Sequence, residues 1–265
     1  MARPKRRLGQ HFLHDPAILR RIAAAAGAGP DDTVLEIGPG PGGLTAALAA
    51  TGARVVAIEK DTELIAPLAT RIPSLILAEG DALELDWHAL AGSERFIIAG
   101  NIPYNITSPL IDKALEPPMP LRVVFLVQKE VAERVAAAPG QGSYGALSVG
   151  VQAVARVERL FSVPAGAFTP PPKVDSAVLR LTPLAVPLIG PADRGSFRAM
   201  VVGLFGLRRK QMLRALRELT GWPAERCALA LEAAGIAVTA RAETLPPATF
   251  VRLFRVLVDG GWGGG

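Results

Sequence analysis

The sequence predicts an α/β protein: a doubly wound, mostly parallel sheet of the Rossmann-like kind, followed by a small, all-helical C-terminal domain. Short continuous apolar runs alternate with helical segments from about residue 33 to residue 138, a pattern typical of buried parallel strands. Strand signals then vanish beyond a proline-rich stretch near residue 185. Half of the 265 residues are hydrophobic, which is enough for a large core.

The first helix has clear end signals. Asp15 is a good N-cap and Pro16 suits the first helical position, so a helix over 17–26 is expected, ended by Gly27. Alternating strands and helices follow. The expected strands are 33–37, 54–58, 75–78, 96–99 and 121–127, and the expected helices are 43–50, 61–71, 108–115 and 129–138.

The rest of the chain changes character. Residues 153–163 and 174–181 alternate like antiparallel edge strands, and the proline-rich residues 182–191 predict a linker. Four helices are expected after it, at 196–205, 210–219, 223–234 and 247–258, and the glycine-rich tail 260–265 is expected to be disordered. The predicted domains are therefore 1–185 and 186–265.

Composition excludes several classes of protein. A single cysteine, Cys227, excludes a disulfide framework and fits a reducing compartment. The basic start lacks the apolar core of a signal peptide, and no uncharged apolar run could span a bilayer. We expect a cytoplasmic, monomeric protein. The three histidines are scattered, so no metal site is predicted.

Charge is segregated along the chain. Residues 1–30 and 186–265 each carry a net charge of +5, whereas residues 31–185 carry −5. Basic ends around an acidic middle suit a polyanionic partner, although solvated arginines explain the numbers equally well.

The ends of the first three strands predict a cofactor site. The first strand runs into Gly38-Pro-Gly40-Pro-Gly42, where the backbone can approach a ligand closely. Glu59 ends the second strand and could accept ribose hydroxyls, and Asp81 follows the third and could hold an adenine amine. Acidic strand ends without a phosphate-binding cation favour cationic S-adenosylmethionine over NAD, although an acid such as Asp81 could simply cap a helix.

Asn101-Ile102-Pro103-Tyr104 follows the apolar run 96–99, where open α/β sheets place their chemistry. The Asn101 side-chain carbonyl and the Pro103 backbone carbonyl are two acceptors beside the Tyr104 ring. They suit a planar base with an exocyclic amine, which predicts a nucleobase amino-methyltransferase. A tyrosine that merely anchors a loop is the alternative.

Together these motifs resemble one family, the KsgA-type ribosomal RNA small-subunit adenine N6-dimethyltransferases. The resemblance rests on seven stretches: 9–13, 36–40, Glu59, 80–82, 101–106, 128–131 and 168–178. It extends to Arg208-Arg209-Lys210 and so covers nearly the whole chain. It implies transfer of methyl groups from S-adenosylmethionine to N6 of two adjacent adenosines near the 3′ end of small-subunit rRNA, in an immature subunit.

The resemblance also assigns residues. Cofactor contacts would be His11, Leu13, Gly38, Gly40, Glu59, Asp81, Ala82 and Asn101, although many relatives carry Asn where this chain has His11. Asn101, Pro103 and Tyr104 would bind the target amine, and Phe168 would close over the base unless it is an ordinary packing residue. RNA contacts are expected from the arm Lys5-Arg6-Arg7 and from Arg208-Arg209-Lys210 at the start of a helix.

Three alternatives stay open: a large-subunit rRNA adenine N6-methyltransferase, an N6-adenine DNA methyltransferase, and an assembly factor that acts mainly by binding. A cysteine-nucleophile methyltransferase is disfavoured, because Cys227 lies within an expected helix.

Overall fold

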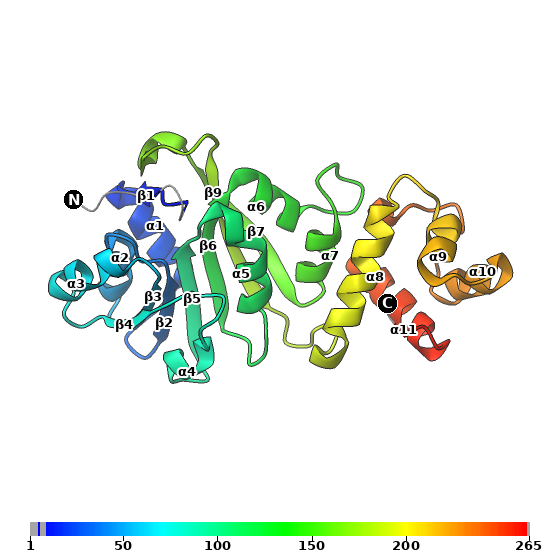
Figure 1. Cartoon of the computed structure of the whole chain (residues 1–265), viewed down its shortest axis with the longest axis horizontal. Coiled ribbons are helices and arrows are strands. Elements are labelled where there is room, and N and C mark those ends of the chain that lie inside the picture. The colour runs from blue at the N-terminus through cyan, green and yellow to red at the C-terminus, as the bar shows by residue number, and fades with distance from the viewer. Residues whose placement is uncertain (1–4, 6–8, 264–265) are drawn as a thin grey trace. The chain divides into compact units, whose positions relative to one another are not determined.

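The computed structural model describes residue 5 and residues 9–263 of the chain. These form two compact units (Figure 1), which are described separately: unit 1 is Met1–Ala132 with Val157–Pro183, and unit 2 is Glu133–Arg156 with Leu184–Gly265. The final break lies two residues before the predicted boundary at 185. Residues 133–156, expected in the first domain, belong instead to unit 2, because α7 (Ala146–Gln152) packs on α8 (Arg194–Gly206) and α11 (Pro247–Asp259) there.

Unit 1 contains the predicted sheet, in the strand order β4-β3-β2-β5-β6-β9-β7. The first five strands in this order pair in parallel, and β9 runs antiparallel to β6, which confirms the predicted fold class. The strands are β2 (Thr33–Ile37), β3 (Arg54–Glu59), β4 (Ile76–Glu79), β5 (Phe96–Asn101), β6 (Arg122–Gln128), β7 (Ala155–Val163) and β9 (Ser176–Pro183).

Helices of unit 1 cover the sheet as the apolar pattern requires. One cluster of buried residues joins alternate side chains of β2, β3 and β5 to α1, α2 and α3, while α4 contacts β2. Asp15 caps α1 as predicted, since its carboxylate accepts from Ala17 N at 2.8 Å. The helices wholly in unit 1 are α1 (Pro16–Ala26), α2 (Gly43–Ala49), α3 (Thr62–Arg71), α4 (Trp87–Ala91) and α5 (Thr107–Ala114), and α6 (Lys129–Ala136) crosses into unit 2 at Glu133.

A two-stranded ribbon was not predicted. β1 (Phe12–Leu13) pairs antiparallel with β8 (Phe168–Thr169), so that Leu13 faces Phe168 across the pair. Two-residue strands leave no periodic pattern in a sequence. The ribbon matters because it fixes the segment just before α1 against the segment just after β7.

Unit 2 is helical, as expected, with α9 (Met212–Thr220) and α10 (Ala224–Ala233) beside α7, α8 and α11. Tyr144 lies in its core, where its hydroxyl donates to the Leu245 carbonyl at 2.7 Å and its ring meets Phe205 edge-on. The ring of Phe205 in turn stacks on Phe250.

Two expectations about loops need correction. The proline-rich stretch is not a loose linker, because Leu184 N donates to Val154 O at 2.9 Å and Leu188 N to Ala153 O at 2.8 Å. The tail is ordered at least to Gly263, with Trp262 N donating to Leu257 O at 2.9 Å. Among the helices that the structure describes, none is long and apolar enough to cross a membrane.

Candidate active site

A cavity of roughly 200 Å³ lies at the carboxyl ends of the parallel strands of unit 1. Its walls come from residues 9–13, 36–41, 58–60, 80–82 and 101–106, with additional side chains from α1 and α2. All eight residues predicted to contact a cofactor line it: His11, Leu13, Gly38, Gly40, Glu59, Asp81, Ala82 and Asn101. Pro103 and Tyr104 line the same cavity, so the predicted cofactor and amine sites adjoin.

The glycine-rich turn after β2 forms the floor of this cavity. Gly38 and Gly40 have φ angles of 68° and 55°, in the left-handed region that favours glycine. A Cβ on Gly40 would lie 3.2 Å from the Phe12 ring. The turn therefore needs glycine both for its conformation and for the close approach of β1.

Glu59 ends β3 with both carboxylate oxygens held by the backbone. Its Oε2 accepts from Gly40 N at 3.1 Å and its Oε1 from Asp61 N at 2.8 Å. The side chain is buried, and burial raises its pKa above the usual range even though these N–H groups oppose the shift. The Lys60 backbone N–H is a third donor, and the carboxylate keeps acceptor capacity for a hydroxyl of a ligand.

Asp81 sits after β4 in a more open setting. Its carboxylate pairs with the Lys60 ammonium and accepts from Leu83 N at 2.9 Å. The hydrogen bond from Lys60 lowers the pKa of Asp81, which keeps the carboxylate ionised. Ala82 is buried beside it, and its carbonyl accepts from the Trp87 indole at 2.7 Å.

Asn101 is the last residue of β5, and its side chain has a defined orientation. Nδ2 donates to the His11 carbonyl oxygen at 2.8 Å. Because a carbonyl can only accept, the amide nitrogen must face His11. The Oδ1 oxygen is therefore the group that Asn101 offers to a ligand.

The Pro103 carbonyl, predicted to accept a hydrogen of the target amine, already has a hydrogen-bond partner in the structure. That oxygen closes the turn η2 (Tyr104–Ile106) by accepting from Ile106 N at 3.2 Å, and it also receives the Thr107 hydroxyl at 3.3 Å. The Ile106 amide therefore uses one lone pair, and the single Thr107 hydroxyl proton is shared with the Tyr104 carbonyl, also 3.3 Å away. The carbonyl of Ile102, one residue earlier on the cavity wall, is the alternative backbone acceptor.

Tyr104 is fixed at both ends of its side chain. Its hydroxyl forms a 2.7 Å hydrogen bond with Ser176 Oγ, and burial raises its pKa. Its ring stacks with the His11 imidazole at a centroid distance of 5.6 Å and an interplanar angle of 21°. The His11 Nδ1 lies 2.8 Å from the Pro170 carbonyl, so Nδ1 carries the proton in this contact.

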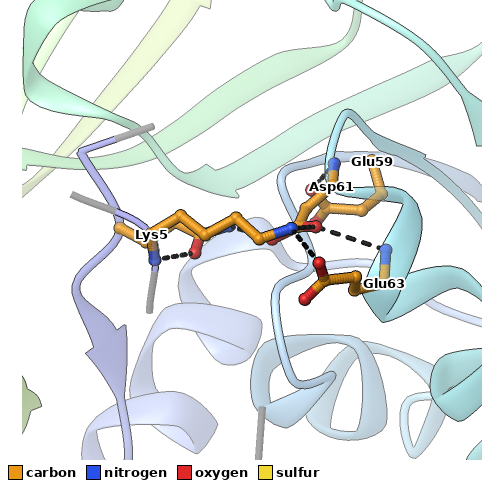
Figure 2. A network of polar contacts seen from close by, with 5 residues as sticks. Lys5, Glu59, Asp61 and Glu63 are labelled. Atoms are coloured by element: carbon orange, nitrogen blue, oxygen red, sulfur yellow. Dashed lines mark hydrogen bonds and ion pairs between the residues drawn. The ribbon is translucent and has the colours of Figure 1, made fainter. Parts of the chain in front are cut away.

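Figure 2 shows Lys5 reaching toward the carboxylates of Asp61 and Glu63. The Lys5 ammonium pairs with Asp61 at 2.6 Å and with Glu63 at 3.0 Å. Asp61, the N-cap of α3, also accepts from Gln10 Nε2 at 3.0 Å. Lys5, predicted to contact RNA, is thus engaged by two carboxylates of its own chain. Arg6 and Arg7, the other predicted contacts of this arm, lie outside the described residues.

The family model for ribosomal RNA adenine dimethylase matches residues 1–259. The chain belongs to the ribosomal RNA adenine dimethylase family. It is accordingly an S-adenosylmethionine-dependent methyltransferase, as the sequence predicted. Ribosomal RNA small subunit methyltransferase A of Phenylobacterium zucineum is 45% identical over 253 residues, covering 94% of this chain and 86% of the relative. The protein of the same name from Pseudomonas aeruginosa is 43% identical and covers 97% and 96%.

Two solved structures are similar to this chain in fold. A dimethyladenosine transferase from Plasmodium falciparum is 28% identical with a TM-score of 0.85, covering 96% of this chain and all of that one. The 23S rRNA methyltransferase ErmE is 32% identical with a TM-score of 0.72, covering 93% and 99%.

Phe168 was expected to close over the target base, but it does not line the cavity. The side chain is 2% exposed and belongs to the core cluster, and it is not part of the cavity wall. Pairing of β8 with β1 directs it inward. The structure therefore supports the packing alternative, and the His11 ring rather than Phe168 lies against Tyr104.

The basic residues of unit 2 lie in the turn between α8 and α9, and not at the start of a helix as predicted. Arg208 pairs with Glu243 and Lys210 with Glu218. Arg209 is exposed. Of the three, Arg209 has the arrangement best suited to meet a phosphate.

Several cavity residues escaped sequence analysis. Gln10 and Lys60 lie beside residues that were named, but their roles depend on partners distant in sequence, Asp61 and Asp81. Glu36, in the motif that was quoted, lines the cavity with a buried carboxyl group. The sequence feature that could have identified Glu36 is a charged residue inside an otherwise mostly apolar strand. No cluster of three potential metal ligands occurs among the residues described.

Proposed function

We propose that this protein transfers methyl groups from S-adenosylmethionine to N6 of two adjacent adenosines near the 3′ end of small-subunit rRNA. The fixed orientation of Asn101, with Nδ2 on His11 and Oδ1 left as an acceptor, carries the proposal. It supplies the acceptor that an exocyclic amine needs, on the wall of the cofactor cavity. The names of the most similar relatives support the small subunit as the target.

The residues of the cavity fit the methyl donor. Glu59 would accept the two ribose hydroxyls through the lone pairs that its backbone contacts leave. Asp81 would accept from the adenine amine, since Lys60 and Leu83 N occupy only part of its acceptor capacity. The positive φ of Gly38 lets the backbone of the turn approach the ligand. Once bound there, the donor supplies an activated methyl group on a sulfonium.

The target amine would be held by two acceptors. Asn101 Oδ1 takes one N6 hydrogen, and the Ile102 carbonyl, in place of that of Pro103, takes the other. With both hydrogens held, the N6 lone pair is drawn out of the ring and aimed at the methyl group. Catalysis is then positioning and electrostatics without a covalent intermediate. The ring of Tyr104 stacks the base, a contact worth about 1–3 kcal/mol.

The RNA partner would be an immature small subunit, bound by a monomer in the cytoplasm. Arg209 is the phosphate contact that we propose in unit 2, since Arg208 and Lys210 pair with acids of their own unit. Phosphate contacts give affinity without sequence, so the shape of the RNA would select the site.

A large-subunit activity is the second candidate, because ErmE, at 32% identity, is a 23S rRNA methyltransferase. To distinguish them, the protein is incubated with methyl-labelled S-adenosylmethionine and, separately, unmethylated small subunits, large subunits, naked rRNA and DNA. Label in small subunits is expected. Label confined to large subunits or DNA would overturn the assignment, and tight binding of small subunits without label would leave an assembly role alone.

A further inference from the structure

Glu36 is a buried carboxyl group that the proposed chemistry leaves unused. It is the penultimate residue of β2 and lines the cofactor cavity, with 1% of its surface exposed. Neither carboxyl oxygen has a hydrogen-bond partner among the residues described. An unpaired carboxylate is very costly to bury, so the charged form needs a positive group that the protein itself does not place there.

The surroundings of Glu36 oppose its ionisation. Across it on α2 lies the Thr45 hydroxyl, which lowers the pKa of the carboxyl but does not reach hydrogen-bond geometry. From β3 comes the carboxylate of Glu59, a like charge, and α1 contributes the apolar Leu19 and Ile22 to the same cavity. Burial is the largest effect and raises the pKa of Glu36 to about 8.

We propose that Glu36 senses the charge of the cofactor: it is protonated while the cavity lacks a cation and ionises when the cationic methyl donor binds. The O–H bond of the carboxyl breaks, its electron pair stays on the oxygen, and the proton passes to solvent. After methyl transfer the sulfonium has become a neutral thioether, and Glu36 takes a proton back as the product leaves. This inference rests on the proposed use of S-adenosylmethionine.

The consequence is a preference for donor over product. S-adenosylmethionine carries one more positive charge than S-adenosylhomocysteine, so a carboxylate in this cavity stabilises the donor complex more than the product complex. After each transfer Glu36 loses part of its counter-charge, which favours release of the product. An enzyme that needs two donors for each dimethylated base gains from rapid exchange.

Proton release can be counted by titration calorimetry of each ligand in two buffers of different ionisation enthalpy. At neutral pH we expect release approaching one proton with S-adenosylmethionine and clearly less with S-adenosylhomocysteine. Glu36→Gln, which copies the neutral form, should abolish the release and reduce the preference for donor over product. Glu84→Gln, the same change at an exposed carboxyl outside the cavity wall, should behave as wild type.

The pH dependence supplies a second readout. Below the pKa of Glu36, the affinity of the wild type for S-adenosylmethionine should rise by up to tenfold per pH unit relative to Glu36→Gln, in which only the ligand titrates. Thr45→Val removes a group that lowers the pKa of Glu36, so the midpoint should move to higher pH. Infrared difference spectra should show a buried carboxylic acid lost on donor binding, in wild type but not in Glu36→Gln.

Donor binding with no proton release, or with the same release in Glu36→Gln as in wild type, would overturn the role of Glu36. An unchanged midpoint of the pH dependence in Thr45→Val, or a midpoint at lower pH, would also contradict it. Failure of the proposed function is distinguishable: a wrong RNA target would appear in the labelling of subunits and leave proton release unchanged, whereas a wrong cofactor would appear as binding of neither ligand.

Discussion

The side-chain amide of Asn101 donates to the main-chain carbonyl of His11 at 2.8 Å, across 90 residues of sequence. This single bond joins the end of β5 to the N-terminal segment and decides which atom of the amide faces a ligand. The proposed chemistry needs an acceptor at this position, and the bond leaves Oδ1 as that acceptor.

Asn101→Ala should abolish methyl transfer while leaving part of the cofactor affinity. Loss of one preorganised polar group that acts on the reacting atoms costs about 10²–10³ in kcat. Asn101→Asp keeps an acceptor for the N6 hydrogen but loses the donor to the His11 carbonyl. We expect it to retain more activity than Asn101→Ala only if accepting the N6 hydrogen matters more than the bond to His11. Rates with saturating cofactor, beside calorimetric Kd values, separate the two effects. Full activity in Asn101→Ala would remove the residue from the chemistry.

Tyr104 tests stacking separately from hydrogen bonding. Tyr104→Phe loses the contact with Ser176 but keeps the ring, whereas Tyr104→Ala loses the ring. Since base stacking is worth about 1–3 kcal/mol, Ala should weaken RNA-dependent kcat/KM by roughly 5- to 150-fold, and Phe by much less. Ser176→Ala is the matched control for the hydroxyl. Equal losses in Phe and Ala would mean that the phenol, and not the ring, is the important group.

The Lys5–Asp61 pair predicts a pH window for the N-terminal segment. Burial opposes the ionised form of Asp61, but hydrogen bonds from Lys5 and Gln10 outweigh it, so the pKa of Asp61 is lowered; the pKa of Lys5 is raised by its hydrogen bond to Asp61. The stabilisation that Asp61 gives to the N-terminal segment is therefore complete above its ordinary pKa of 3.8. It is lost as pH falls through the lowered pKa. The stabilisation that Lys5 gives is complete below its ordinary pKa of 10.5. It is lost as pH rises through the raised pKa.

Hydrogen exchange of the amides of residues 9–13 checks this window. Lys5→Met and Asp61→Asn should speed the exchange at neutral pH, and Lys5→Arg should do so least. Because residues 9–13 line the cavity, cofactor affinity should fall in the same order. Unchanged exchange in Lys5→Met would show that the ion pair does not hold the segment.

Arg209 should contribute more to RNA affinity than either neighbour. If it meets a phosphate, Arg209→Ala should weaken binding of small subunits and reduce the dependence of log K on log salt by about one. Arg208→Ala removes a side chain that already pairs with Glu243 and should change the salt dependence less. Filter binding at several salt concentrations measures both. The reverse order would assign the phosphate contact to Arg208.

The sequence predicted the sheet and the cofactor wall well, because both depend on local patterns. Continuous apolar strands and glycine-rich or acidic strand ends can be recognised from short runs of consecutive residues. All eight residues predicted to contact the cofactor line one cavity. The cap at Asp15 is equally local.

What the sequence could not predict depends on distant partners. Lys5 became an anchor and Phe168 a core residue because Asp61 and β1 lie against them. The role of the Pro103 carbonyl changed because a turn closes on it. Residues 133–156 joined unit 2 because helices from beyond residue 184 pack on them. None of these contacts can be detected from the local sequence around the residue concerned.

The most direct test is the nucleoside that the enzyme makes. Small subunits lacking the modification are incubated with the protein and S-adenosylmethionine, and the rRNA is digested and analysed by mass spectrometry, with the positions mapped by reverse transcription. We predict N6,N6-dimethyladenosine at two adjacent adenosines near the 3′ end, formed about 10²–10³-fold more slowly with Asn101→Ala. Methylation of another atom or another base, or no methylation of small subunits, would contradict the account.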